Sequence, residues 1–393
     1  MSLGWALRGY IGGGPLGAMI PGALVALYLC LLLQRDGDDA AVIAAFGAIG
    51  IGFGGQMTYG QTIGLALQPE TRWWGLTGLG LKGAIWGLLG GAVLALALVR
   101  DRFSFRQIAI GVLAMGLMTQ AGWKLINEPK LIYFSNPIDK PRPELWAGLA
   151  LGALALLGWL NDRVVWSFAK RGAACGGIGF AVGGAIQVAG RGYGPEHPLI
   201  GYWKLMELFL GAMLGLGFGS AAWRWRVDLQ RRPRVQEVLS EWQHVAMGAA
   251  VVVGALLLNE AEARAHYTVA GVPMLLIAVK WPAAAWHLAV TTTYAAFSLD
   301  FRRNRPALDP GLLLAGVTLT SFAIAWIVAR WRSAPPLFLL LLWTSVMNSL
   351  AKSFVPLNPA AQAELVPMEA LFVLMAAAAT VLAPRWGGTR SKA

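Results

Sequence analysis

Long uninterrupted apolar runs are the feature that most constrains how this chain can fold. A helix needs roughly 20 apolar residues to cross about 30 Å of hydrocarbon, and such runs follow one another along the 393 residues. Only 13% of the residues are charged, against about 25% in soluble domains, so a soluble fold would lack the side chains to cover its surface. The sequence therefore predicts an all-α, polytopic transmembrane helical bundle that forms one integral membrane domain over residues 1–393.

Short polar breaks divide the runs into about 12 predicted spans. The predicted spans cover residues 15–34, 40–57, 74–99, 107–123, 145–160, 164–188, 200–223, 242–258, 271–299, 311–329, 336–351 and 366–383. The ninth contains Pro273, Lys280 and Pro282. Because proline interrupts helical hydrogen bonding, we expect this segment to be one broken helix, or a re-entrant piece followed by a span.

Basic residues cluster between the runs and account for the net charge of +12. The clusters lie at 100–106, 161–171, 224–234, 302–305 and 385–392. This is typical of cytoplasmic loops that meet anionic lipid. Nucleic-acid binding is not expected, because no basic face alternates with exposed aromatic residues. We therefore expect membrane lipids as partners, an outward N-terminus and a multi-pass protein of a bacterial inner (plasma) membrane.

If every predicted span crosses the membrane once, the basic clusters in the middle of the chain all fall on the cytoplasmic side, but those further towards the C-terminus do not. Such crossings would place Arg330, Arg332 and the basic C-terminus outside, against the positive-inside rule. Either the last third contains one span more or fewer than counted, or the ninth segment does not cross once.

An internal similarity links two glycine-rich segments. Residues 47–55 align with 176–184 at an offset of 129, five of the nine positions are identical, and Trp74 then falls on Trp203. Both copies run in the same direction in the orientation above, which predicts a parallel repeat. Repeat 1 covers 15–123, repeat 2 covers 145–258, and irregular C-terminal helices follow over 271–383. Chance alignment of two glycine-rich helices is the alternative.

The stretch 50–55, GIGFGG, matches a dinucleotide-binding fingerprint, and Glu70 lies downstream where the ribose-binding acid would stand. Such a site needs a strand, a turn and a helix in a soluble sheet, whereas these glycines continue an apolar run. Close packing of transmembrane helices through small residues is the favoured interpretation. No cofactor is expected.

Ionisable residues inside the spans are costly, so each is a candidate functional residue. Lys82 is the only charged residue within 74–99, and Lys204 and Glu207 are three residues apart on one helical face. In the repeat alignment Glu207 falls on Gly78, one turn from Lys82. We expect Lys82 and Glu207 to meet between the repeats as an ion pair or a substrate site. Alternatively, Lys82 extends to the outer interface and Lys204 satisfies Glu207.

Polar residues gather at the outward ends of the two glycine-rich helices. We assign them to a substrate pocket or, equally, to plain loops: Gln56, Tyr59 and Gln61 in the first copy, and Gln187, Arg191, Tyr193 and His197 in the second. Arg8, which precedes a glycine-rich run, suits phosphate, sulfate or carboxylate, or a lipid headgroup. All of these residues, with Lys82, Lys204 and Glu207, are candidate substrate-binding residues.

Other polar groups have simpler expected roles. Asp38 or Asp39 is expected to cap the following helix, and His287 with Thr291 favours hydrogen-bonded packing over proton transfer. Cys30 and Cys175 both lie in apolar segments, so no metal site is expected.

The sequence contains no recognisable catalytic motif, and enzymatic activity is left open. We expect a transporter or flippase for a small polar or anionic solute or a lipid-linked substrate, bound between the two glycine-rich repeats. The alternative is a membrane-embedded transferase acting on a lipid-linked or glycan substrate.

Overall fold

The computed structural model describes residues 1–11, 13–135, 144–192, 201–230, 240–260, 267–294, 309–354 and 366–387. In chain order its elements are α1 (Ser2–Ile11), α2 (Gly14–Leu33), α3 (Gly37–Gly54), α4 (Gly60–Leu67), α5 (Arg72–Leu98), η1 (Arg100–Arg102), α6 (Phe105–Gly122), η2 (Trp123–Asn127), α7 (Trp146–Leu160), α8 (Arg163–Gly192), α9 (Tyr202–Arg224), α10 (Arg226–Leu229), α11 (Glu241–Glu260), α12 (Tyr267–Lys280), α13 (Pro282–Trp286), η4 (His287–Thr291), α15 (Pro310–Trp331), α16 (Ala334–Phe354) and α18 (Val366–Gly387). All of these elements are helical, which confirms the predicted fold class.

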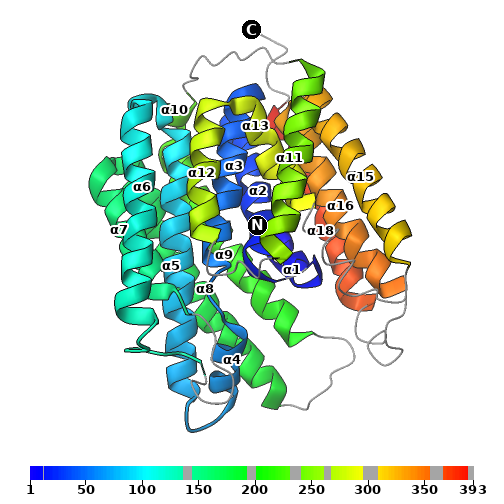
Figure 1. The fold of residues 1–393 in the computed structure, drawn as a ribbon. Helices are drawn as coiled ribbons and strands as arrows, with labels where there is room; N and C mark the ends of the chain where they lie inside the picture. Colours follow the sequence, from blue (N-terminus) through cyan, green and yellow to red (C-terminus); the bar gives the residue numbers. More distant parts are fainter. Residues whose placement is uncertain are drawn as a thin grey trace.

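Six of these helices are long and apolar enough to cross a membrane: α2, α3, α5, α6 with its continuation η2, α8 and α9. Shorter apolar helices lie within α7, α12, α16 and α18. The chain is therefore a multi-pass membrane protein by length and composition, while the count of twelve spans stays a prediction. The helices lie roughly side by side in one bundle (Figure 1).

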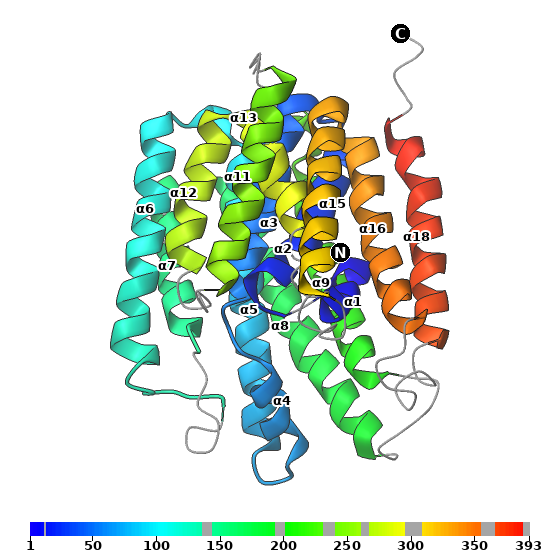
Figure 2. The same cartoon turned by 45° about the vertical axis from the view of Figure 1, so that its right-hand side comes forward.

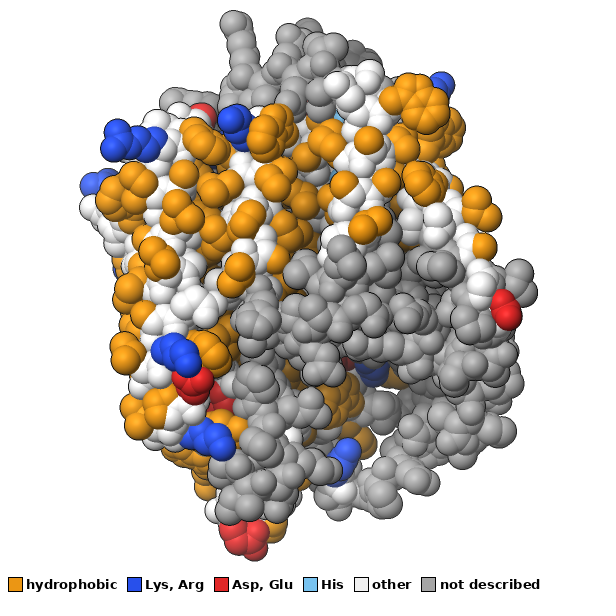
Figure 3. Space-filling view, viewed as in Figure 1, with side chains coloured by type: hydrophobic (Ala, Val, Ile, Leu, Met, Phe, Trp, Pro, Cys, Tyr) orange, Lys and Arg blue, Asp and Glu red, His pale blue; other side chains and the backbone are white. Residues whose placement is uncertain are grey.

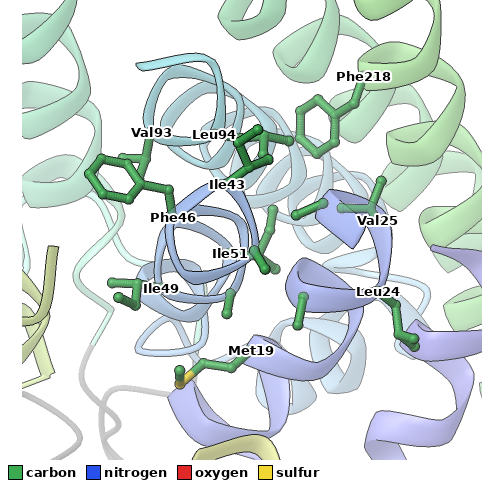
Figure 4. Packing of buried hydrophobic residues seen from close by; sticks show 14 of the residues in the cluster. Met19, Leu24, Val25, Ile43, Phe46, Ile49, Ile51, Val93, Leu94 and Phe218 are labelled. Atoms are coloured by element: carbon green, nitrogen blue, oxygen red, sulfur yellow. The ribbon is translucent and has the colours of Figure 1, made fainter. Parts of the chain in front are cut away.

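The centre of the bundle is formed by helices that are apolar on every side. The apolar windows of α2, α3 and α5 are 83%, 89% and 83% buried, whereas those of α6 and α8 are only 33% and 39% buried. Side chains of α2, α3, α5 and α9 interlock at this centre (Figure 4). The less buried helices therefore turn an apolar face outward, as membrane helices do.

One flank of the molecule is almost uniformly apolar. Leu117 of α6 is 70% exposed, Val269 of α12 is 60% exposed and Val253 of α11 is 54% exposed, and Figure 3 shows orange side chains covering these helices. An exposed patch of this extent is stable only against lipid or another apolar partner.

The basic connections meet at one end of the bundle. Asp39 forms ion pairs with Arg35 and Arg100. Arg35 also donates to the carbonyl oxygen of Leu229, and Arg102 pairs with Asp162 at 2.9 Å. The connections after α2, α5, α7 and α9 therefore lie together, at the upper end in Figures 1 and 2. We call this the basic end.

The connection between α15 and α16 also lies at the basic end. The carboxylate of Asp36 accepts from the Ser333 hydroxyl at 3.0 Å and from the Ala334 amide at 2.7 Å, and α18 ends on the same side (Figure 2). Arg330 and Arg332 therefore join the other basic connections. The ninth predicted segment is two helical pieces, α12 and α13 with η4, separated at Trp281 before Pro282. Two separate crossings by these pieces would remove the conflict in the sequence.

The predicted cap by Asp38 or Asp39 is wrong. The N-cap residue of α3 is Asp36, whose side chain makes no capping hydrogen bond there, and Asp38 and Asp39 lie inside the first turn. The carboxylate of Asp36 instead caps the start of α16, and that of Asp39 is held by two arginines. A pair of buried guanidinium groups competes more strongly for a carboxylate than a free backbone amide does.

The parallel repeat also stays a prediction. Its two glycine-rich segments lie in helices of different length, since α3 has 18 residues and α8 has 30. α5 packs most extensively against α8, so the third predicted span of repeat 1 adjoins the second predicted span of repeat 2.

Candidate functional site: a buried arginine in an aromatic cage

Arg8 lies in the last turn of α1, a helix of ten residues at the N-terminus of the chain. α1 packs on α9 at Gly211, where an added Cβ would lie 2.8 Å from both Ser2 Cα and Trp5 Cβ. The Ser2 hydroxyl donates to the Leu208 carbonyl oxygen at 2.8 Å. These contacts hold α1 inside the bundle and leave the Arg8 side chain only 2% exposed.

Three aromatic rings surround the Arg8 guanidinium. Its Cζ atom lies 5.5 Å from the ring centroid of Trp5, 5.3 Å from that of Tyr59 and 5.4 Å from that of Trp86. Trp5 and Trp86 meet edge to face at 4.8 Å. Each ring face attracts the cation, by about 2 kcal/mol where water is excluded. We call Arg8 with these three rings the Arg8 cage.

Tyr59 connects the cage to a carboxylate. Its hydroxyl accepts from Arg8 Nη1 at 3.0 Å and donates to Glu207 Oε1, also at 3.0 Å. Glu207 accepts two further bonds, from Trp203 Nε1 at 3.0 Å and from Lys204 Nζ at 2.8 Å. The Glu207 side chain is 1% exposed. Four predicted site residues, Arg8, Tyr59, Lys204 and Glu207, therefore form one buried network.

Glycines at the end of α3 make room for the cage. An added Cβ at Gly54 would overlap the Trp86 indole, whose Nε1 donates to the Ile51 carbonyl oxygen at 2.7 Å. An added Cβ at Gly55 would lie 2.5 Å from the carbonyl oxygen of Gly14, which itself has a φ of +81°. The GIGFGG stretch thus lies in a helix and its end, where glycine permits close approach, as the packing interpretation expects.

Lys82 and Glu207 do not form the predicted ion pair. Lys82 Nζ lies 2.9 Å from Glu144 Oε1, and both side chains are fully buried. Lys82 also donates to the Thr58 carbonyl oxygen at 2.7 Å and to the Thr62 hydroxyl at 2.8 Å. The alternative in which Lys82 extends to the outer interface is equally wrong, whereas Lys204 does satisfy Glu207.

Glu144 is held as completely as its partner. Its Oε2 accepts from the Phe134 amide at 2.9 Å, and its Oε1 accepts from the Ser135 hydroxyl at 2.6 Å. The pair is therefore balanced in charge and saturated in hydrogen bonds, which is the condition for burying ions at tolerable cost.

The remaining predicted residues do not join the network. Gln56 binds the first turn of α12, since its amide nitrogen donates to Thr268 Oγ1 at 2.9 Å and its oxygen accepts from the Thr268 amide at 3.2 Å. Gln61 and Gln187 each have a shielded side-chain oxygen without a partner among the described residues. Arg191 is exposed near the end of α8. Tyr193 and His197 lie outside the described residues.

The face between α5 and α8 is closed by backbone contact. An added Cβ at Gly83 would overlap the carbonyl oxygen of Gly176, and one at Gly87 would overlap that of Gly172. Such contact leaves no space for a substrate along this stretch. The buried charged groups of the candidate site therefore lie at the Arg8 cage and its network rather than along the face between α5 and α8.

Several residues of the site have no distinctive sequence signal. Trp5, Trp86 and Phe180, whose ring centroid lies 5.3 Å from that of Tyr59, are apolar residues within apolar runs. Glu144 had a weak signal, as an acid directly before the run at 145–160. Only a three-dimensional arrangement identifies them as partners of Arg8 and Lys82.

His287 is hydrogen-bonded and packed. Its Nδ1 lies 3.0 Å from Thr291 Oγ1, and its ring centroid lies 5.8 Å from that of His244. Within the described part of the chain, no three histidine, cysteine or acidic side chains gather as a metal site would require.

No protein-family model, no curated protein and no solved structure matches this chain.

Proposed function

We propose that this protein is a membrane carrier or flippase whose substrate bears an anionic group, bound at the Arg8 cage. One observation carries the proposal: the guanidinium of Arg8 is buried without a carboxylate at ion-pair distance among the described residues. A buried cation is costly unless it is paired. An anionic substrate would supply the missing charge.

Charge counting in the network supports an anion. Arg8 and Lys204 carry one positive charge each, and Glu207 carries one negative charge, which leaves an excess of one positive charge. The Nε atom of Arg8 is shielded from solvent and has no acceptor among the described residues. A guanidinium with free donors binds carboxylate, sulfate or phosphate through paired hydrogen bonds.

The position of α1 supports movement of the substrate. A short helix that ends inside the bundle is typical of carriers, in which broken helices bind the substrate at membrane depth. α1 joins α2 through Gly13 and Gly14, where an added Cβ would meet no atom within 4 Å. Because glycine has no Cβ, rotation about φ and ψ of Gly13 would let α1 tilt and carry Arg8 with it.

At the Arg8 cage the geometry favours a carrier over a transferase. A transferase would need an acid or histidine free to exchange a proton with the substrate. The carboxylate of Glu207 already accepts from Tyr59, Trp203 and Lys204, so it serves better as a fixed countercharge than as a base. The span count, the parallel repeat and the bacterial inner membrane are further parts of this proposal.

Binding of small anions to the purified protein in nanodiscs tests the first step. The probes are inorganic phosphate, sulfate and acetate, and the readout is the midpoint of thermal unfolding. An anion at 100 times its Kd adds about 2.7 kcal/mol of stability, and this gain should vanish in Arg8→Gln but persist in the exposed control Arg191→Gln. Arg8→Lys keeps the positive charge. If the anion stabilises Arg8→Lys but not Arg8→Gln, the loss in Arg8→Gln reflects the missing charge rather than misfolding.

Exchange of the bound anion across proteoliposomes tests the second step. Vesicles loaded with the unlabelled anion should accumulate the labelled anion faster with wild-type protein than with Arg8→Gln. The carrier proposal fails if no anion stabilises the wild type more than the variant, or if a bound anion is never exchanged.

A further inference from the structure

A cavity of about 430 Å³ opens at the basic end of the molecule, between the first turns of α8 and the last turn of α9. Four cationic side chains line it: Arg163, Lys170, Arg171 and Arg224. Its volume is within the range of ligand pockets, about 300–1,000 Å³. It is separate from the Arg8 cage, because Glu207 and Arg224 are 17 positions apart on α9 and hence about 25 Å apart along its axis.

None of the described residues that line this cavity is acidic. The four cations form no ion pair with any described residue. The acid nearest to them in the sequence, Asp162, already has other partners. Asp162 pairs with Arg102 at 2.9 Å and accepts from the Val164 and Val165 amides at the start of α8. The positive field of the cavity is therefore not neutralised by the protein itself.

Two indoles and one hydroxyl give the cavity its shape. The Lys170 ammonium lies 5.2 Å from the ring centroid of Trp166, and Arg171 donates to the Ser167 hydroxyl. These contacts restrict two of the four cations. The indole N–H of Trp225, which also lines the cavity, is shielded and has no acceptor among the described residues. The residues that line the cavity thus carry donors of both charged and neutral type.

We propose that this cavity binds a phosphate group, carried either by a phospholipid headgroup or by a soluble phosphate compound. Phosphate offers several strong acceptor oxygens and at least one negative charge, which match a set of arginines better than a single carboxylate does. Tryptophan beside basic residues is typical of the level of lipid headgroups. The site is independent of the carrier proposal, which concerns the other end of α9.

Calorimetric titration of the detergent-purified full chain tests this proposal with three probes. They are dihexanoylphosphatidylglycerol, inorganic phosphate and, as the zwitterionic comparison, dihexanoylphosphatidylcholine. Each basic residue near a membrane surface contributes about 1 kcal/mol, so Arg163→Gln or Arg224→Gln should weaken anion binding about fivefold, and the double variant about thirtyfold. Arg106→Gln removes the same charge at the same end outside the cavity and should leave binding unchanged.

The outcomes separate the two sources of phosphate. Binding of phosphatidylglycerol alone identifies a lipid headgroup, whereas competition by inorganic phosphate identifies a site for soluble phosphates as well. Arg163 and Arg224 are exposed, so without ligand the variants should have the same midpoint of thermal unfolding as the wild type. If the midpoint of the double variant is lower, the binding data of the two single variants test the proposal. The proposal is overturned if neither anion binds, or if Arg106→Gln weakens binding as much as the cavity variants do.

Discussion

Lys82 and Glu144 form an ion pair from which solvent is completely excluded, at 2.9 Å between Nζ and Oε1. The pair lies next to the Arg8 cage, because Lys82 donates to the carbonyl oxygen of Thr58 and the following residue, Tyr59, joins Arg8 to Glu207. Two buried polar networks are thus connected by two consecutive residues between α3 and α4. A displacement of this segment would change both networks together.

Removing one member of the Lys82–Glu144 pair should be severely destabilising. Lys82→Met leaves a buried carboxylate, and Glu144→Gln leaves a buried ammonium, so each should lower the free energy of unfolding by about 3–5 kcal/mol. Unfolding in SDS, followed by circular dichroism, measures the change. In the exposed pair Lys124–Glu128, whose side chains are 63% and 44% exposed, Lys124→Met should cost at most about 1 kcal/mol. Equal effects at the two pairs would refute the assignment.

The Tyr59 hydroxyl should matter more than another buried tyrosine hydroxyl. Tyr59→Phe leaves Arg8 and Glu207 each short of a hydrogen bond, which costs about 1–3 kcal/mol. The matched control is Tyr267→Phe, because the shielded Tyr267 hydroxyl has no partner among the described residues and its removal should be neutral or stabilising. Thermal midpoints in one detergent compare the two variants, and a larger loss at Tyr267 would contradict the network.

Because the backbones of α5 and α8 are in contact, one added methyl group between them should lower the stability of the protein. An added Cβ at Gly87 would overlap the carbonyl oxygen of Gly172, so Gly87→Ala must force the helices apart, at a cost of about 1–3 kcal/mol or more. Gly158 of α7 has no atom within 4 Å of an added Cβ. Gly158→Ala should instead be neutral or stabilise by up to about 1 kcal/mol, because alanine favours helix. The difference in thermal midpoint is the measurement.

The double pairing of Asp39 predicts that the basic end depends on one carboxylate. Asp39→Asn leaves Arg35 and Arg100 buried without their countercharge, and we expect a loss of about 3–5 kcal/mol in SDS unfolding. Asp101 lies nearby in the chain but is exposed and has no ion pair among the described residues, so Asp101→Asn should change stability by less than about 0.5 kcal/mol.

The helices could be predicted from the sequence because their signal is local. Apolar run length depends only on neighbouring residues, and each predicted span except the ninth falls on one helix. Pairing within one helix was also predictable, as Lys204 and Glu207 show, since a spacing of three residues brings side chains together.

Partners from distant parts of the chain could not be predicted. Glu144 and Glu207 both lie at the ends of apolar runs, so either could be the ion-pair partner of Lys82. Only the packing of α5 against α7 and α8 shows that the partner is Glu144. The Arg8 cage was missed for a similar reason. Its rings are Trp5, Tyr59 and Trp86, which come from three separate segments, and tryptophan in a membrane sequence is more typical of an interfacial belt.

The side of the membrane on which the connection between α15 and α16 lies can be tested by one experiment. The count of single crossings in the sequence and the arrangement of the helices in the structure give different answers. If α12 and α13 with η4 are two passes, Ser333 lies on the same side as Asp101, and Glu70 lies on the opposite side. Single cysteines at these positions, with Cys30 and Cys175 replaced by alanine, would be labelled with a membrane-impermeant maleimide in intact cells and in inverted vesicles. We expect Ser333→Cys and Asp101→Cys to react together in inverted vesicles, because both belong to the basic end, which should face the cytoplasm. Reaction of Ser333→Cys together with Glu70→Cys would show that the ninth segment crosses the membrane only once.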